Sequence, residues 1–230
     1  NKLIIKFAFW FEGFIYKRAQ LINVLTPAFR DKLIRVKNVP KEKVILIPNA
    51  ADFSLAEKIQ KDSSFNALKF KKELGLENKF VITYVGAHGV ANHLIQLIDA
   101  AEKLQNTNIV FQLIGSGMRK EFLQKEVIKR SLSNVIFRES VPKSEVFKYI
   151  LASDVGTSVL KNVETFKTIY SNKTFDYMSC KKPILLVIDG VSRELIETAK
   201  CGVFAKPENP LSIANKSKEM STLEKSDLNQ

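Results

Sequence analysis

The segment FVITYVGAHGVANHLIQLIDAAEKLQNTNIVFQLIG, residues 80–115, decides the fold. It begins and ends with short runs, 80–86 and 109–115, whose apolar residues are continuous instead of alternating, as in strands covered on both faces. The stretch between these runs has the length and the periodicity of a helix. A strand, a helix and a second strand in this order predict a right-handed βαβ unit in a parallel sheet.

The same rhythm continues along the rest of the chain. Further strand-like runs lie at 134–138, 155–160, 183–188 and 202–205, and helical patterns lie at 119–132, 142–153 and 192–200. Alternating strands and helices predict an α/β fold with a Rossmann-like, doubly wound parallel sheet.

Residues 1–50 have a different pattern. A helix-like segment is followed by a Thr-Pro helix start, a second helix and a short strand, VILI, which ends at PNAAD. The Pro-Asn-Ala-Ala-Asp run is a turn signal and indicates a domain boundary near 48–54. We expect residues 1–50 to be the tail of an N-terminal domain plus a linker, and residues 51–230 to form the Rossmann-like domain.

The chain is strongly basic, with a formal charge of +12. This charge favours an anionic partner, such as a nucleotide phosphate, a nucleic acid or an acidic membrane face. Lysines are scattered over most segments without a basic motif that carries stacking aromatics, which disfavours nucleic acid. Cys180 and Cys201 imply no disulfide framework, and no apolar run reaches the roughly 18 residues of a spanning helix. The expected location is cytoplasmic.

Ligands of doubly wound sheets bind at the carboxyl ends of the strands, so the loops there are candidate sites. Gly86 and Gly89 follow the first strand, and either allow close approach of a ligand or make a tight turn. Gly115 follows the second strand, before Arg119 at a helix start. A cation there opposes the helix dipole, which an anionic ligand or simple solvation would explain.

The stretch SNKTFDYMSCKKPILLVIDG, residues 171–190, carries two charges on an otherwise apolar helix. Ser171 or Asn172 is expected to cap this helix. Lys173, Asp176 and Tyr177 then share one face by their i, i+3 and i+4 spacing. A salt bridge within the helix is the simpler explanation of the two charges, and a binding site is the other.

Five segments in order resemble those of retaining glycosyltransferases of family 4, which have the GT-B fold. They are VILIPNAAD, VITYVGAHG, FQLIGSGMRK, NVIFRESVPKSEVFKYILASDVG and NKTFDYMSCKKPILL, and the similarity runs from about residue 15 to about residue 210. The chain looks most similar to the branch that elongates lipid-linked sugars for bacterial capsules and O-antigens.

The resemblance implies a two-domain enzyme whose C-terminal domain binds a nucleotide-sugar donor, commonly UDP-linked, and whose N-terminal domain binds the acceptor. Asp176 falls where the family usually has the second Glu of its E-x7-E motif, which binds the ribose hydroxyls. Thr168 takes the place of the first Glu, and Glu164 could supply its sugar contacts only if the loop folds back. The catalytic residues therefore stay unknown.

In many members an Arg and a Lys neutralise the diphosphate, whereas this chain has Ala87 and Asn92 in those places. Lys173 is then the first candidate for the phosphate-binding cation, and Arg119 is the second. His88 is expected either to touch phosphate or to be a solvated turn residue. No cofactor and no metal are expected, because the histidines lack clustered carboxylates or cysteines.

Several alternatives stay open at this point. A non-catalytic donor-binding subunit of a split enzyme would share these features, and so would a nucleotide-sugar epimerase, which would need Glu164 and His88 as acid and base. The aromatic segment 7–16, with its basic flanks, predicts either contact with the inner face of the cytoplasmic membrane or packing against another domain. We expect residues 1–230 alone to bind the donor but not to transfer its sugar.

Overall fold

The computed structural model describes residues 2–223. By its internal contacts the chain divides into two compact units. The first comprises residues 1–49 with 168–170, and the second comprises residues 50–167 with 171–230.

The first unit is built from α1 (Lys2–Arg18), β1 (Ile22–Val24), α2 (Pro27–Arg35), the short 3-10 helix η1 (Lys41–Lys43) and β2 (Val44–Leu46). The two strands pair in parallel. Thr26 caps α2, because its hydroxyl oxygen accepts a hydrogen bond of 3.0 Å from the Phe29 amide, and Pro27 opens the helix. The predicted Thr-Pro helix start and the VILI strand are thus confirmed.

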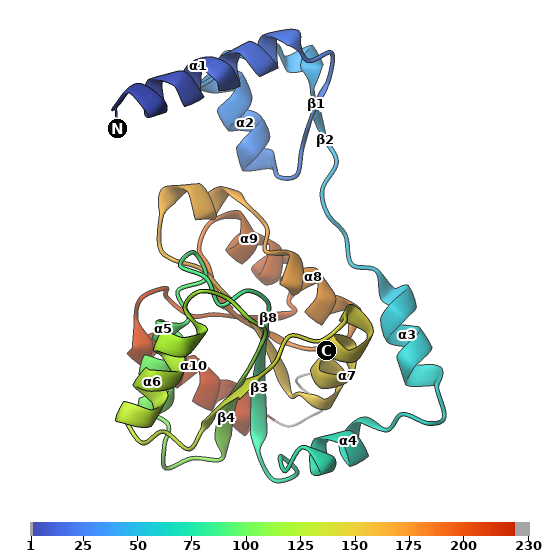
Figure 1. The fold of residues 1–230 in the computed structure, drawn as a ribbon. Helices are drawn as coiled ribbons and strands as arrows, with labels where there is room; N and C mark the ends of the chain where they lie inside the picture. Colours follow the sequence, from blue (N-terminus) through green and yellow to red (C-terminus); the bar gives the residue numbers. More distant parts are fainter. Residues whose placement is uncertain (1, 224–230) are drawn as a thin grey trace. The chain divides into compact units, whose positions relative to one another are not determined.

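The second unit contains a parallel sheet of six strands in the order β5-β4-β3-β6-β7-β8. Strands β3, β4 and β8 are labelled in Figure 1. All six strands were predicted. In chain order they are β3 (Phe80–Val85), β4 (Ile109–Ile114), β5 (Val135–Arg138), β6 (Val155–Val159), β7 (Ile184–Val187) and β8 (Gly202–Phe204). The strand order reverses between β3 and β6, which makes this edge the topological switch point where doubly wound sheets bind ligands.

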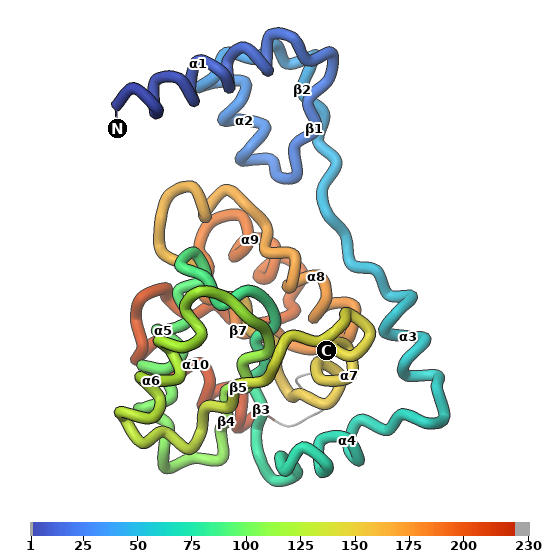
Figure 2. The backbone as a smooth tube through the Cα atoms, viewed as in Figure 1, coloured from blue at the N-terminus to red at the C-terminus, as the bar shows by residue number. Residues whose placement is uncertain are grey.

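Helices connect the strands of this sheet, and Figure 2 traces the chain through them. Helices α5, α6 and α10 pack together, α8 contacts β6 and β7, and α3 and α4 pack on α7. The helices after β3, β4, β5 and β7 were predicted, whereas α3 and α4 were not. Their bounds are α3 (Phe53–Lys61), α4 (Ala67–Glu73), α5 (Ile95–Glu102), α6 (Lys120–Lys129), α7 (Lys143–Ala152), η2 (Glu164–Thr168), α8 (Asn172–Ser179), α9 (Val191–Ala199) and α10 (Pro210–Thr222).

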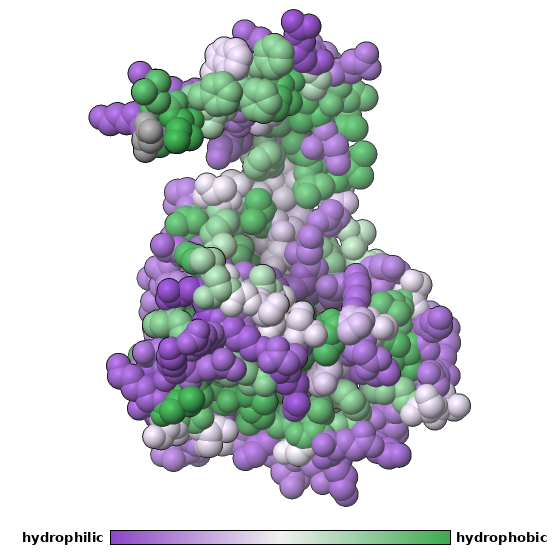
Figure 3. Space-filling view, viewed as in Figure 1, coloured by the Kyte–Doolittle hydropathy of each residue, from purple (hydrophilic) through white to green (hydrophobic). Residues whose placement is uncertain are grey.

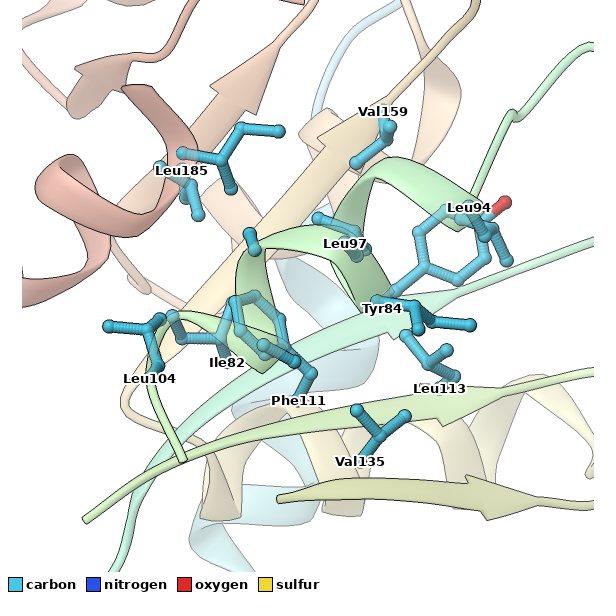
Figure 4. Close-up of a cluster of buried hydrophobic side chains, with 14 of the residues drawn as sticks. Ile82, Tyr84, Leu94, Leu97, Leu104, Phe111, Leu113, Val135, Val159 and Leu185 are labelled. Carbon is cyan, nitrogen blue, oxygen red and sulfur yellow. The ribbon is translucent and has the colours of Figure 1, made fainter. Parts of the chain in front are cut away.

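The two faces of the sheet differ in character. One face carries the main apolar core, in which Tyr84, Leu97 and Phe111 are fully buried (Figure 4). The alternate residues of β3 and β4 are partly polar: the Gln112 side-chain amide donates to the Thr83 hydroxyl over 3.1 Å, and the Thr83 hydroxyl also pairs with that of Ser153. These buried polar groups satisfy one another, so they lie in the interior without an unpaired donor.

Candidate functional site

A cleft of about 520 Å³ opens at the carboxyl ends of β3, β4 and β5, beside the first turn of α8. This is the position that the strand order favours for a ligand. Residues of α7 and of the loop before it complete the lining. The lining residues are Val85, Gly86, Ile114, Gly115, Ser140, Val141, Lys143, Val146, Asn172, Lys173 and Asp176.

Two of the predicted glycines bring the loops after β3 and β4 into direct backbone contact. The Gly86 amide donates to the Ile114 carbonyl over 3.0 Å, and both Gly86 (φ 132°) and Gly115 (φ 142°) lie in the region that favours glycine. A Cβ on Gly115 would lie only 2.0 Å from the Gly86 carbonyl oxygen. A side chain on Gly115 would therefore force the loops apart, and a side chain on Gly86 would meet Lys173 Cε at 3.2 Å.

Tyr177 anchors α8 across the switch point. Its buried hydroxyl accepts a hydrogen bond from the Val85 amide over 3.1 Å and donates to the Thr157 carbonyl over 3.0 Å. Its ring occupies the space above Gly156, where an added Cβ would lie 2.3 Å from the ring. The prediction that Tyr177 shares the exposed charged face of α8 is wrong, because this side chain is fully buried beneath the helix.

Lys173 and Asp176 do face the cleft, as the spacing of the charges predicts. Lys173 Nζ lies 5.1 Å from the centre of the Tyr84 ring and 3.3 Å from the Ser171 hydroxyl oxygen. Partial removal from water lowers the pKa of Lys173 from 10.5 to about 8, against the opposing effect of the Asp176 charge. A lysine in this state is a cation at neutral pH that gains from an anionic ligand.

The start of α8 has the predicted position but a different hydrogen-bond pattern. Ser171 is the N-cap residue, yet its side chain does not cap the helix and instead pairs with Lys173. Asn172, the first residue of α8, is exposed and lines the cleft. The first amides of a helix have no acceptor within it, so this end of α8 presents donors and the positive end of the helix dipole to the cleft.

Asp176 pairs with a residue that the sequence analysis did not single out. Lys143 Nζ, at the start of α7, lies 3.1 Å from Asp176 Oδ1. The Asp176 side chain is 27% exposed and that of Lys143 is 64% exposed. The predicted alternative, a salt bridge within α8, is not what the structure has: the ionic partner of Asp176 comes from another helix.

His88 does not line the cleft. Its side chain is fully buried beside the rings of Tyr84 and Phe137, and its backbone amide donates to Ser116 while its carbonyl accepts from Arg119. Burial lowers the pKa of His88 to about 4, and the charge of Lys120 contributes in the same direction. The prediction of a phosphate contact or a solvated turn is therefore wrong: His88 is a neutral interior residue that ties the two glycine loops together.

The remaining predicted residues also lie away from the cleft. Gly89 has ordinary backbone geometry and room for a Cβ, and the guanidinium of the exposed Arg119 stacks over the Phe122 ring at 4.1 Å. Glu164 is exposed and pairs with Lys167 over 2.6 Å, and Thr168 belongs to the first unit. Within residues 2–223, no group of three or more His, Cys, Asp or Glu side chains is placed to hold a metal ion.

A number of solved glycosyltransferases of the GT-B type share this architecture. Anabaena HepE, solved in complex with UDP and glucose, superposes with a TM-score of 0.76 at 20% identity, over 90% of this chain and 55% of HepE. WaaG, a glycosyltransferase involved in lipopolysaccharide biosynthesis, superposes with a TM-score of 0.74 at 16% identity, over 90% of this chain and 54% of WaaG. At these identities the likeness establishes the fold.

The family follows from the sequence itself. Residues 66–230 match the family described as glycosyl transferases group 1, and the chain belongs to that family. It is also similar to WcaI of Escherichia coli (strain K12), whose name assigns it to colanic acid biosynthesis as a glycosyl transferase, with 29% identity over 116 residues. That alignment covers 50% of this chain and 28% of WcaI, so the chain spans only part of the length of its relatives.

Proposed function

We propose that the cleft binds the nucleoside diphosphate of a nucleotide-sugar donor and that the chain is the donor-binding part of a retaining glycosyltransferase of family 4. The observation that carries the proposal is that a cation and a carboxylate of the same helix line a single cleft: Lys173 and Asp176 lie one turn apart on α8, at the switch point of the sheet. A nucleoside diphosphate presents the matching groups, phosphates and a ribose diol. HepE, which shares the fold, is solved with UDP-glucose.

Each part of the donor has a proposed contact. The diphosphate approaches the amides at the start of α8 and the ammonium of Lys173, and Gly86 and Gly115 leave room for it. The carboxylate of Asp176 accepts hydrogen bonds from the ribose hydroxyls. The base lies against the loop before α7, where Ser140 and Val141 line the cleft.

This arrangement would assist departure of the nucleoside diphosphate. Negative charge grows on the phosphates as the bond to the sugar carbon breaks, and positioned amides together with Lys173 stabilise that charge. In our proposal the protein performs this step without a metal ion, and the sugar carbon keeps its stereochemistry. Residues that contact the sugar and the acceptor are not assigned.

The acceptor is proposed from the relatives. We infer a lipid-linked glycan in the synthesis of a bacterial surface polysaccharide such as a capsule or O-antigen. The name of WcaI and the described role of WaaG support this inference. We further propose that the first unit is part of the acceptor-binding domain.

An epimerase is a weaker alternative. That reaction needs acid and base groups beside the sugar, and the two that the sequence offered, Glu164 and His88, lie outside the cleft. Asp176 is the sole acid among the described residues that line it. A non-catalytic donor-binding subunit would bind the same ligand, and only a transfer assay on the complete assembly separates it from an enzyme.

A membrane surface is a second proposed partner, and α1 is the feature that favours it. All its residues are exposed or half-buried, and Phe7, Trp10, Phe11 and Phe14 form a row of ring contacts with centroid separations of 5.7 to 6.1 Å. The helix contributes to the apolar surface seen in Figure 3. Its ends carry basic residues, Lys2, Lys6, Lys17 and Arg18, which complement anionic headgroups. No helix in the described part of the chain is long and apolar enough to cross a membrane.

Trp10 reports directly on this contact, because it is the single tryptophan of the chain. Its emission is expected to shift to the blue with vesicles that contain phosphatidylglycerol and to stay unchanged with phosphatidylcholine alone. No shift with either vesicle would remove the membrane from the list of partners.

Calorimetric titration of the 230-residue chain with UDP, GDP and ADP tests the donor site. We expect one of them to bind with a Kd between micromolar and low millimolar. Asp176→Ala should weaken binding by about tenfold or more, because hydrogen bonds to a charged group each contribute about 1.5–3 kcal/mol. Lys173→Met should weaken it as well.

Lys72→Met is the matched control. Lys72 is an exposed lysine on α4 that pairs with Glu77 over 3.6 Å, outside the cleft, so its loss should leave binding unchanged. Binding that survives both cleft substitutions would contradict the proposal. Donor binding, and not transfer, is the activity to test because the chain spans about half the length of HepE.

A further inference from the structure

Lys143 and Asp176 join two helices across the cleft. Lys143 is the first residue of α7, directly after Pro142, and Asp176 lies in the middle of α8. Their charged atoms are 3.1 Å apart, and both residues line the cleft. The pair therefore lies within the site and is not a salt bridge on a distant surface.

The ammonium of Lys143 is bound to the carboxylate of Asp176, which is the proposed acceptor for the ribose hydroxyls of the donor. A carboxylate has two oxygens that accept hydrogen bonds. When both hydroxyls of a ribose donate to the same carboxylate, they engage both of these oxygens. Lys143 Nζ contacts Oδ1. A ribose that reaches Asp176 must therefore share this oxygen with the ammonium or displace it.

We propose that Lys143 competes with the ribose of the donor for Asp176 and is thereby a determinant of donor affinity. This inference rests on the function proposed above and adds to it a residue that opposes binding. In this role Lys143 is not a phosphate-binding cation. It reduces the contribution of the ribose hydroxyls to the affinity for the donor.

The surroundings of Lys143 allow its displacement. Its side chain is 64% exposed, and exposed ion pairs are weak enough to be broken at modest cost. Its ammonium lies 5.5 Å from the centre of the Phe147 ring, one turn further along α7, which offers an alternative contact.

The test is the preference for ribose over its dideoxy analogue. The Kd values of the chain for UDP and for 2′,3′-dideoxy-UDP are measured by calorimetry, and their ratio reports the contribution of the hydroxyls alone. Removing a positive charge affects both ligands through the phosphates, and that effect cancels in the ratio. Lys143→Met should raise the preference for UDP about two- to fivefold, the range expected on releasing an exposed ion pair.

Two matched variants complete the experiment. Lys143→Arg keeps the charge and should leave the preference near the wild-type value. Lys148→Met removes a lysine of the same helix that pairs with Glu145 over 2.8 Å, outside the cleft, and should not change it either.

The outcomes separate this inference from the proposed function. If the wild type binds UDP but Lys143→Met leaves the preference unchanged or reduces it, Lys143 does not compete with ribose and the inference is overturned, whereas the donor site stands. If neither the wild type nor any variant binds UDP, GDP or ADP, both are overturned. Binding of UDP that is detectable only in Lys143→Met would support both.

Discussion

Removal of the Tyr177 hydroxyl is the substitution whose effect follows most directly from the geometry. Tyr177→Phe keeps the ring above Gly156 but leaves the Val85 amide and the Thr157 carbonyl without their shared partner, inside a fully buried region. A buried polar group left unpaired costs about 1–3 kcal/mol. Since two groups lose the same partner and some relaxation is expected, the free energy of unfolding should fall by about 2–3 kcal/mol.

This loss is measurable in two ways. The midpoint of urea unfolding should fall, and the melting temperature should fall by about 4–12 °C for a unit of this size. The affinity for UDP should also fall, because the hydroxyl joins α8, which carries Lys173 and Asp176, to the end of β3 and the middle of β6.

Tyr149→Phe is the matched control. Tyr149 is a half-buried residue of α7, and its ring packs against Phe70 at a centroid separation of 5.1 Å, a contact that survives loss of the hydroxyl. Its stability should change by less than about 1 kcal/mol. Equal stability of Tyr177→Phe and Tyr149→Phe would refute the view that Tyr177 fixes α8 on the sheet.

Three further predictions concern the loops and the charged groups. Gly115→Ala should lower the free energy of unfolding by about 3 kcal/mol or more, because its Cβ would lie 2.0 Å from a carbonyl oxygen. Gly75 also has a positive φ but has open space around it, so Gly75→Ala should lower the free energy of unfolding by about 1 kcal/mol. In the folded chain the pKa of His88 is about 4, whereas in the unfolded chain it is about 6.5. Protonation below pH 6.5 therefore favours the unfolded chain. Between pH 7 and pH 4.5 the free energy of unfolding should fall by about 2.5 kcal/mol more in the wild type than in His88→Phe. Since the pKa of Lys173 is about 8, its charged fraction should fall about fourfold between pH 7 and 8.5, and the affinity for UDP should fall with it. Lys173→Met should lose this pH dependence. A wild-type affinity that does not change with pH would exclude Lys173 as the phosphate contact.

The fold could be predicted from the sequence because its signals are local. The strands of the second unit are continuous apolar runs, typical of a sheet covered on both sides, and the alternation with helices restricts the topology. Gly86, Gly115, Lys173 and Asp176 were found by the rule that sites lie at the carboxyl ends of strands. These residues line the cleft.

The features of the site that the sequence did not predict depend on contacts between distant segments. Helical spacing placed Tyr177 beside Lys173, but Gly156 leaves a space in β6 that the aromatic ring fills, and a glycine inside a strand was the available signal for such close packing. Lys143 was missed because its partner lies on another helix. From its loop, His88 was expected either to touch phosphate or to be a solvated turn residue. Its backbone instead bonds to Ser116 and Arg119, and its side chain is buried beside Tyr84.

Hydrogen exchange with and without UDP is the most direct test of the proposed donor site, since it reports where the nucleotide binds. Asn172 and Lys173 form the first turn of α8, and both line the cleft. If the nucleotide binds in the cleft, UDP should slow exchange in peptides that cover residues 171–177 and the loops at Gly86 and Gly115. Protection confined to other parts of the chain, with these peptides unchanged, would contradict binding in the cleft.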